Sequence, residues 1–342
     1  MIIPIFILFF LAALLSFNKK KYIQSTRSDT VLLFLFSITL IIIATFRPTE
    51  MSDYNNYFMI FRTEKMGRTE IGFTLIVHWV RTWSKEPLLL FGIFAALSIM
   101  IKMWAICKMS PFIWTSVMIY ISNIFILHDM IQIRCAIASG LLLWAIKYIN
   151  ERKLWKFLII SSLALLFHNS AITIFPLWFL STKRFQKKTF ICLIPLSYVL
   201  ALSGHLFGNY AQFIEIQSYQ HLWKIYHSTI GNDEVNIFNT IQLLRCSICL
   251  FILYHINMIA KYNSLIILLV KIYTISLVSL ILLSDIPVIA FRISELYQVI
   301  EILLIPMFIY IYRNQYVSGR VISFIIALCI LLLNTFYLKL LL

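Results

Sequence analysis

The sequence predicts an all-α polytopic membrane protein, and three observations support this fold class. Of the 342 residues, 61% are hydrophobic and only 13% are charged, whereas soluble domains carry about 25% charged residues. The mean hydropathy is +0.89. Apolar runs of roughly 17–25 residues, the length of a membrane-crossing helix, recur from end to end. They lack strict alternation, which favours helices over closed barrels, the other structures able to span lipid.

We expect about ten full transmembrane helices in a single integral membrane domain that covers residues 1–342. The predicted spans are 1–17, 30–46, 88–107, 112–127, 135–150, 189–203, 240–260, 265–283, 296–312 and 320–341. The first run has no basic residue before it and no small-residue cleavage site after it, so we interpret it as a span. Lys19, Lys20 and Lys21 follow it, which predicts a periplasmic N-terminus.

The stretch 154–182 allows two interpretations. Basic residues flank both of its ends, within 152–156 and within 183–188, so both ends are expected on the cytoplasmic side. This favours a hairpin of two short helices that bends near His168. One long, tilted span is the alternative.

Charged residues are unevenly distributed among the predicted loops. Lys and Arg concentrate at 18–29, 151–156 and 182–188, which predicts that these loops face the cytoplasm. Most of the acidic residues fall in the main outer loops, which are 47–87, 128–134, 204–239 and 284–295. The net charge of +15 is therefore interpreted as a topology signal beside anionic lipid, and we expect no nucleic-acid partner.

Two outer segments combine aromatic and polar side chains. The stretch IGFTLIVHWVRTW in the first outer loop is too short to cross a bilayer and predicts a helix in the outer interface. The stretch YQHLWKIYH in 204–239 is typical either of an interfacial aromatic belt or of a surface that stacks on sugar rings. The sequence shows no zinc signature and no glycine-rich phosphate loop, so we expect no metal and no other cofactor.

A short polar break interrupts the apolar sequence in ILHDMIQIRCAIASG. It contains His128, Asp129, Gln132 and Arg134. An arginine at this position is either an anchor that touches lipid headgroups or a ligand for a phosphate. Asp129 and Gln132 are candidates to orient it, and His128 is interpreted as an interface residue.

Five short motifs occur in order along the chain. They are Asp53-Tyr54-Asn55-Asn56-Tyr57, Glu70-Ile71-Gly72-Phe73, Arg134 with Ala136 and Ala138, Leu166-Phe167-His168-Asn169-Ser170-Ala171, and Phe291-Arg292-Ile293-Ser294-Glu295-Leu296-Tyr297. In this order and at these spacings, the chain resembles the EpsG-like branch of the Wzy-type polysaccharide polymerases. These enzymes make O-antigen, and thus lipopolysaccharide, or exopolysaccharide.

The resemblance implies a metal-independent glycosyltransferase of the bacterial inner membrane, with its active site on the periplasmic side. Such an enzyme transfers a growing glycan from undecaprenyl diphosphate to a sugar hydroxyl of another lipid-linked repeat unit. The lipid diphosphate is the leaving group, and no cofactor takes part. The implied partners are undecaprenyl-diphosphate-linked oligosaccharides and the lipid bilayer, with a chain-length regulator and a flippase as further candidates.

That chemistry suggests roles for the motif residues. A diphosphate leaving group needs fixed cations, and Arg134 and Arg292 are the leading candidates, with Arg245 as a third. Because Arg245 lies inside a predicted span, we expect it to bind an anion, either Glu301 or a substrate phosphate.

The acceptor hydroxyl needs a base, and histidine and carboxylates are the usual groups for this task. His168 is the leading candidate, with Asp53 and Glu295 in reserve. The other residues expected to bind substrate or to support the site are Asp129, Gln132, Tyr54, Tyr57, Glu70, Asn169 and Tyr297.

Two other functions remain alternatives. A polysaccharide-unit transporter or flippase would also place charges inside a membrane bundle, but transporters commonly show repeated halves, and no such symmetry is visible here. A membrane O-acyltransferase that modifies sugars would also use a histidine near the membrane. The ordered motifs fit this enzyme less well.

Overall fold

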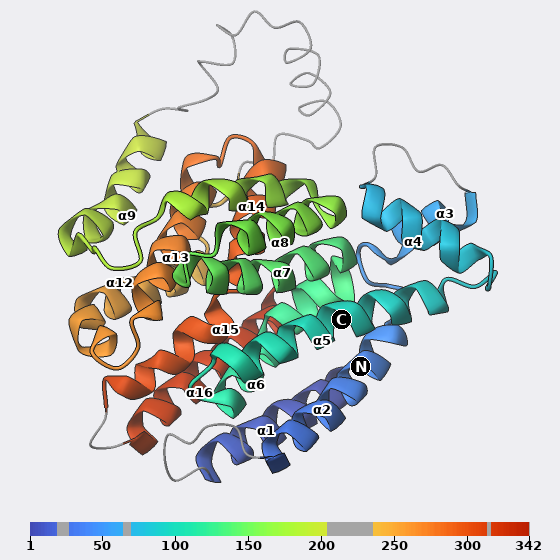
Figure 1. The fold of residues 1–342 in the computed structure, drawn as a ribbon, viewed down its shortest axis with the longest axis horizontal. Helices are drawn as coiled ribbons and strands as arrows, with labels where there is room; N and C mark the ends of the chain where they lie inside the picture. Colours follow the sequence, from blue (N-terminus) through green and yellow to red (C-terminus); the bar gives the residue numbers. More distant parts are fainter. Residues whose placement is uncertain (19–26, 64–69, 204–234, 313–315, 342) are drawn as a thin grey trace, which may run out of the picture.

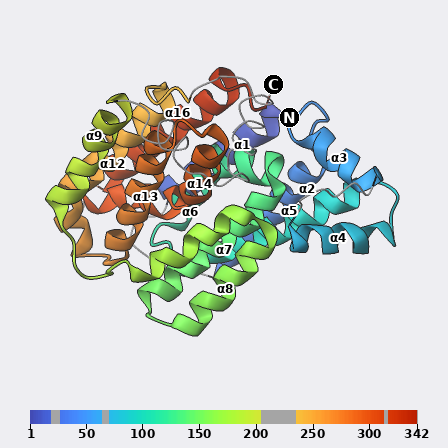
Figure 2. The ribbon, with the colours of Figure 1, turned by 90° about the horizontal axis from the view of Figure 1, so that it is seen from above.

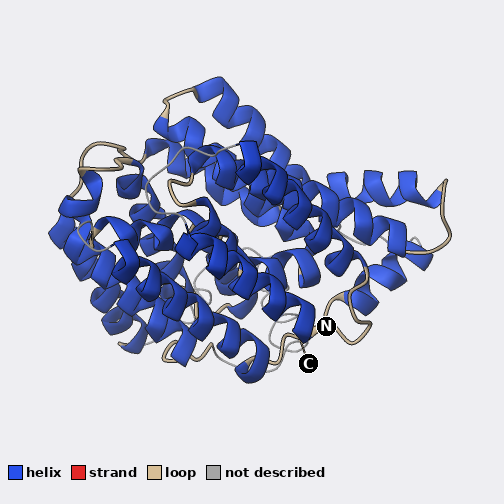
Figure 3. Cartoon of the chain, turned by 90° about the horizontal axis from the view of Figure 1, so that it is seen from below, coloured by secondary structure: helices blue, strands red, loops and turns tan. Residues whose placement is uncertain are grey.

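The computed structural model describes residues 1–342 except 19–26, 64–69, 204–234, 313–315 and 342. In the described part, the chain consists of helices and loops, without strands (Figure 3). The helices from the N-terminal half are α1 (Ile2–Asn18), α2 (Arg27–Thr45), α3 (Tyr54–Thr63), α4 (Ile71–Arg81), α5 (Leu88–Met109), α6 (Ile113–Ser122), η1 (Phe125–Ile131), α7 (Ile133–Asn150) and α8 (Leu154–Phe167). They are followed by η2 (Asn169–Phe179), α9 (Lys187–Leu202), α12 (Thr240–Ala260), α13 (Leu265–Leu282), α14 (Pro287–Gln298), α15 (Glu301–Leu304), η3 (Ile305–Tyr310), α16 (Tyr316–Leu332) and η5 (Leu333–Tyr337).

Six of these helices are long and apolar enough to cross a membrane. They are α2, α5, α7, α12, α13 and the continuous α16–η5. A seventh span is possible if α6 and η1, which meet at an angle of 61°, cross together. By length and composition the described chain therefore supports six or seven spans, where the sequence predicted about ten.

The number of spans is smaller than predicted because several apolar segments are short or broken. Helix α1 has 17 residues and α9 has 16, with Pro195 inside it, so both are short for the ~20 residues that a full crossing needs. The expected span 296–312 is divided into the end of α14, the four-residue α15 and the 3₁₀-helical η3, which has Pro306 in its first turn. Proline lacks the backbone donor that a continuous helix requires.

The helices form an elongated bundle with α3 and α4 at one end and α9 and α12 at the other (Figures 1 and 2). Helix α7 runs through the middle and is the most buried of the candidate spans, at 78%. The two termini lie close together in Figure 1 and Figure 2. The polar break that precedes α7 is consequently placed in the interior of the bundle, where other helices can supply its partners.

The stretch 154–182 is a hairpin of two short helices. Helix α8 ends at Phe167 because the extended backbone of His168 (φ −154°, ψ 121°) stops the α-helix. The 3₁₀ helix η2 then returns beside α8. Arg152, just before α8, donates from Nη1 to the Trp178 carbonyl (2.9 Å) and from Nη2 to the Leu180 carbonyl (2.7 Å). These bonds join the two open ends of the hairpin, so a single long span is excluded.

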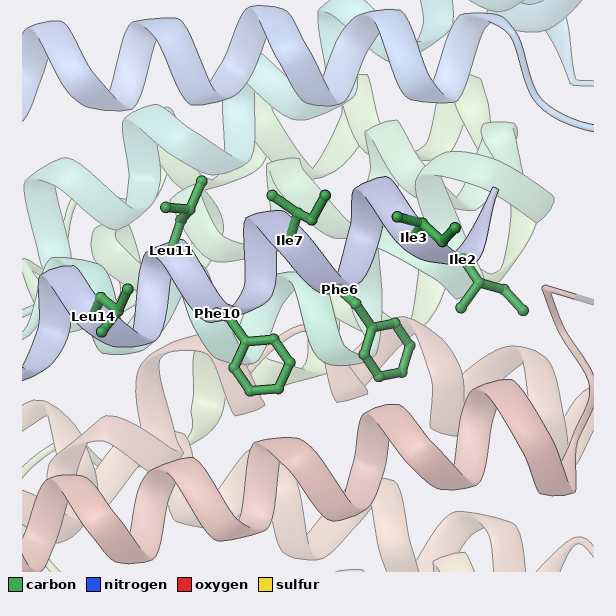
Figure 4. A pocket seen from close by; sticks show the side chains of 7 residues that line it. All are labelled: Ile2, Ile3, Phe6, Ile7, Phe10, Leu11 and Leu14. Carbon is green, nitrogen blue, oxygen red and sulfur yellow. The ribbon is translucent and has the colours of Figure 1, made fainter.

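Helix α1 presents an apolar face to its surroundings. A shallow groove of about 410 Å³ runs along it, and Figure 4 shows the side chains that line this groove. The groove is lined by Ile2, Ile3, Phe6, Ile7, Phe10, Leu11 and Leu14. A continuous exposed apolar surface of this kind is unusual on a soluble protein and suits contact with lipid chains.

Candidate active site

Glu70 is the meeting point of three motifs that are far apart in the sequence. The carboxylate is buried just before α4, and its Oε2 accepts a hydrogen bond from Arg134 Nη1 at 2.5 Å. Its Oε1 lies 3.5 Å from His168 Nδ1 and accepts a longer bond from the Asn169 backbone N–H, at 3.4 Å. Glu70, Arg134, His168 and Asn169 are referred to below as the Glu70 cluster.

A glycine allows α4 to approach the hairpin closely enough to form this cluster. A Cβ atom at Gly72 would lie 2.8 Å from the Leu166 carbonyl oxygen, closer than such atoms approach one another. The absence of a side chain at Gly72 therefore lets the start of α4 rest on the last turn of α8. This contact sets Glu70, two residues earlier, beside His168.

Arg134 projects from the first turn of α7 into a partly open setting. Its guanidinium lies 5.7 Å from the Tyr57 ring centroid and 5.6 Å from that of Phe73. Its side chain is 24% exposed, and its Nε has no hydrogen-bond partner among the described residues. Arg134 is thus held on one side by Glu70, and the exposed part of its side chain is accessible to another anion.

The last motif joins the site through Gln132. Its Nε2 donates to Glu295 Oε2 at 2.7 Å, which connects the residue before α7 to α14. The exposed guanidinium of Arg292 acts electrostatically on both Asp53 and Glu295. Asp53, Gln132, Arg292 and Glu295 therefore form a second set of interacting polar side chains, and Asp53 connects this set to Arg134.

The carboxylates of the site differ in their proton affinity. Burial by itself would raise the pKa of Glu70, but His168, Arg134 and the backbone hydrogen bond together hold it at about 2. Burial raises the pKa of Asp53 above its ordinary value, against the opposing charges of Arg134 and Arg292. Burial likewise raises the pKa of Glu295, although Gln132 opposes this. Glu70 is therefore an anion at neutral pH, whereas the other two carboxylates are better proton acceptors.

Two predicted site tyrosines have other contacts. The Tyr297 hydroxyl donates to the Thr173 carbonyl at 2.6 Å and so ties α14 to η2. The Tyr54 ring packs against Phe91, with centroids 5.2 Å apart. Tyr57 is buried beside Arg134, and Asn169 reaches Glu70 by its backbone while its side chain is exposed.

The expected role of Asp129 is wrong. Its Oδ1 pairs with Lys102 Nζ at 2.7 Å and its Oδ2 accepts from the Tyr120 hydroxyl at 2.7 Å. Both of its oxygens are thus engaged within the core, so it does not orient Arg134. Gln132 also bonds to Glu295 instead of Arg134. His128 is fully buried, with Nδ1 3.0 Å from the Ser139 hydroxyl, and is not an interface residue.

The sequence left two anions open as the partner of Arg245, Glu301 or a substrate phosphate. In the structure the partner is Glu301. Arg245 Nε donates to Glu301 Oε1 at 3.1 Å, and the Tyr273 hydroxyl donates to the same oxygen at 2.8 Å. Asn123 donates to the other oxygen of Glu301 at 3.0 Å. Arg245 is therefore engaged in the core and is not a free third cation for a diphosphate.

Sequence reasoning missed Lys102, the partner of Asp129. The signal was present, because a lysine in the middle of an apolar span is costly unless it is paired. Arg47 was also missed; it lies two residues after the end of α2 and is buried. No group of three or more His, Cys, Asp or Glu side chains in the described part of the chain is arranged to hold a metal ion.

Comparison with known proteins completes the description of the site. No curated protein and no solved structure matches the chain. The model of the EpsG family matches residues 30–341, a range that includes every residue of the Glu70 cluster. The chain therefore belongs to the EpsG family.

Proposed function

We propose that this protein is a membrane glycan polymerase that uses lipid-linked repeat units. It would transfer a growing glycan from undecaprenyl diphosphate to a sugar hydroxyl of a second lipid-linked unit. The observation that carries the proposal is the Glu70 cluster, in which one buried carboxylate holds an arginine and a histidine side by side. Membership of the EpsG family, which is associated with glycan polymerisation, supports it.

The reaction breaks the bond between the anomeric carbon and the diphosphate oxygen. The acceptor hydroxyl oxygen forms the new bond to that carbon, and the electron pair of the broken bond leaves with the diphosphate. The partly exposed Arg134 and the exposed Arg292 are the cations for the leaving group. A guanidinium suits this task because it binds two phosphate oxygens at once.

His168 is assigned as the base that takes the proton of the acceptor hydroxyl. Its Nδ1 faces Glu70 Oε1, and an adjacent carboxylate favours the tautomer with the proton on Nδ1, which leaves Nε2 to accept one. The separation of 3.5 Å is long for a hydrogen bond, but such bonds commonly tighten when substrate binds. Asp53 and Glu295 are the reserve bases, and their raised pKa values suit proton acceptance.

The topology that we propose follows from the loop charges. The N-terminus and the candidate site face the periplasm, and the hairpin ends face the cytoplasm of a bacterial inner membrane. Single cysteines at exposed Glu50 and Gln186 test this orientation, with a membrane-impermeant thiol reagent added from outside. Labelling at position 50 with protection at 186 is expected, and the reverse pattern would refute the orientation.

Transport is the second candidate, because two ion pairs, Lys102–Asp129 and Arg245–Glu301, are buried among the helices. Charges inside a bundle are a feature of transporters. Purified protein incubated only with lipid-linked repeat unit separates the two functions. A polymerase forms a ladder of longer lipid-linked products, whereas a transporter moves the unit across a vesicle membrane and leaves its length unchanged.

The same assay tests the base. His168→Ala should lower kcat by a factor on the order of 10²–10⁴, while the binding of lipid-linked substrate persists, because the histidine acts on the hydroxyl and not on the diphosphate. His255→Ala is the matched control, because that histidine lies on α12 against Tyr254 and Phe251, away from the cluster. A near wild-type rate for His168→Ala would transfer the role to Asp53 or Glu295.

A further inference from the structure

A polar cavity of about 290 Å³ lies at the junction of the end of α2, the start of α3 and the start of α5. The residues that give it its chemical character are Phe46, Arg47, Tyr54, Glu86 and Phe91. Its volume is near the lower limit of small-molecule sites, roughly 300–1,000 Å³. It has room for one small ring and not for a whole oligosaccharide.

Arg47 is the buried cation of this cavity. Its Nε donates to the Ala44 carbonyl at 2.9 Å, its Nη1 donates to the Met130 carbonyl at 2.6 Å, and its guanidinium lies 4.5 Å from the Phe91 ring centroid. Its Nη2 has no hydrogen-bond partner in the described part of the chain. A buried N–H without an acceptor is destabilising and uncommon. Because Nη2 has almost no accessible surface, Arg47 contributes its positive charge to the cavity.

The charges of the cavity favour a neutral ligand over an anion. Glu86 faces the same space as Arg47, and its carboxylate would repel a phosphate. The carboxylate of Glu86 can accept hydrogen bonds from hydroxyl groups, while Phe46 and Tyr54 line the same space with aromatic side chains. This combination matches a sugar ring, which carries hydroxyls on its rim and C–H groups on its faces.

We propose that this cavity binds one sugar residue of the lipid-linked glycan. The inference rests on the proposed polymerase function and adds a glycan subsite to it. Helix α3 connects the subsite to the diphosphate site, because Tyr54 lines the cavity and Tyr57, about one turn further along, lies beside Arg134. A glycan held here would remain within reach of the reacting centre.

Direct binding tests the subsite without any polymerisation. Full-length protein in lipid nanodiscs is titrated with a panel of methyl hexosides and methyl N-acetylhexosaminides, with binding followed by saturation-transfer NMR. Pyrophosphate is the competing probe. We expect at least one glycoside to bind and pyrophosphate not to displace it. Glu86→Gln should weaken binding roughly tenfold, the effect of one hydrogen bond to a charged group, and Tyr54→Leu by a similar factor.

Glu50→Gln is the matched control for Glu86→Gln. Glu50 is an exposed acid of the same outer segment whose carboxylate accepts from Thr49 and does not line the cavity. Glycoside binding by this variant should equal that of wild type. Because Glu86 is exposed at the rim, its substitution is not expected to disturb folding, which a thermal unfolding curve verifies.

The outcomes separate the two proposals. If no glycoside binds, if Glu86→Gln and Tyr54→Leu leave binding unchanged, or if pyrophosphate displaces the sugar, the subsite is refuted. Product ladders formed by the same preparation would then leave the polymerase proposal intact. If glycosides bind in the cavity but lipid-linked units are never extended, the subsite is supported and the polymerase proposal fails.

Discussion

The Glu70 cluster and the Lys102–Asp129–Tyr120 group are both built around an ion pair next to α7, but they differ in access and in how fully they are bonded. Lys102 and Asp129 have 0% exposed side chains, and the two oxygens of Asp129 are taken by Lys102 and Tyr120. In the Glu70 cluster, Arg134 is 24% exposed and its Nε is unpartnered among the described residues.

This difference indicates different roles. An ion pair with no exposed surface is out of reach of a ligand, and it holds elements together. Lys102 on α5 and Asp129 on η1 thereby position the segment that leads into Gln132 and Arg134. A cation that is anchored on one side and open on the other is preorganised for an incoming anion.

Breaking the buried pair should have the largest effect. Lys102→Met leaves Asp129 as an unpaired buried charge, and Asp129→Asn leaves Lys102 in the same state, so each should reduce the free energy of unfolding by about 3–5 kcal/mol. The double variant Lys102→Met/Asp129→Asn leaves no unpaired charge and should recover much of the loss. Denaturant unfolding in detergent measures all four proteins.

The exposed Lys153 serves as the control for this cycle. Its ion pair with Glu151 is 2.7 Å long, but the lysine side chain is 52% exposed, so Lys153→Met should cost at most about 1 kcal/mol. If Lys102→Met is as mild as Lys153→Met, the buried pair does not stabilise the fold and the comparison is wrong.

Removal of the partly exposed cation, Arg134, should mainly affect catalysis. Arg134→Ala is expected to lower the polymerisation rate by a factor on the order of 10²–10³, measured as ladder formation by correctly inserted protein. Arg134→Lys should recover little, because an ammonium does not bind two phosphate oxygens as a guanidinium does. Arg184→Ala, at an exposed position outside the site, should retain the wild-type rate. Normal turnover by Arg134→Ala would exclude it from the site.

The contribution of Glu70 to the stability of the protein should depend on pH in a defined way. Because the pKa of Glu70 is about 2 in the folded protein and 4.5 is the ordinary value, its interactions stabilise the fold above pH ~4.5 by about 3 kcal/mol. This contribution is lost as the pH falls from about 4.5 towards 2. The stability difference between wild type and Glu70→Gln should therefore be constant from pH 8 to pH 5 and shrink below that.

A difference that instead grows on acidification would show that Glu70 is protonated in the native state. Glu86→Gln is a suitable comparison, since Glu86 is an exposed glutamate in the segment between α4 and α5. Its substitution should leave stability nearly unchanged at every pH, as is usual for surface positions.

The smallest expected effect is that of metal removal. In the proposed reaction arginines, and not a metal ion, neutralise the charge of the leaving diphosphate, so polymerisation should continue in EDTA at an unchanged rate. Abolition by the chelator with recovery on addition of magnesium or manganese would contradict this expectation. It would also mean that a bound metal ion, and not Arg134 alone, neutralises the leaving group.

Much of the site could be predicted from sequence because its residues belong to recognisable short motifs. Glu70, Arg134 and His168 were all selected in this way, and the structure brings them together. The partner of each residue was harder to predict. Asp129 is five residues from Arg134, yet it pairs with Lys102, 27 residues away, because side chains on η1 and α7 point to different neighbours.

The number of spans was overestimated for a related reason. Hydropathy reports how apolar a stretch is, but it does not report where the helix breaks. The apolar segment 296–312 satisfies the length criterion, and yet the chain divides it around Val299–Ile300 and at Pro306. Breaks of this kind depend on packing as well as on composition.

The sequence by itself determined the membrane class, the helical character, the positions of most helices and the family, because apolar length, charge distribution and short motifs are local properties. Only the tertiary structure decided that 154–182 is a hairpin, that Glu70 joins Arg134 to His168, and that Asp129 and Arg245 are bound within the core. The physical reason is that a buried charge must find its partner in space, and that partner is set by helix packing across distant parts of the chain.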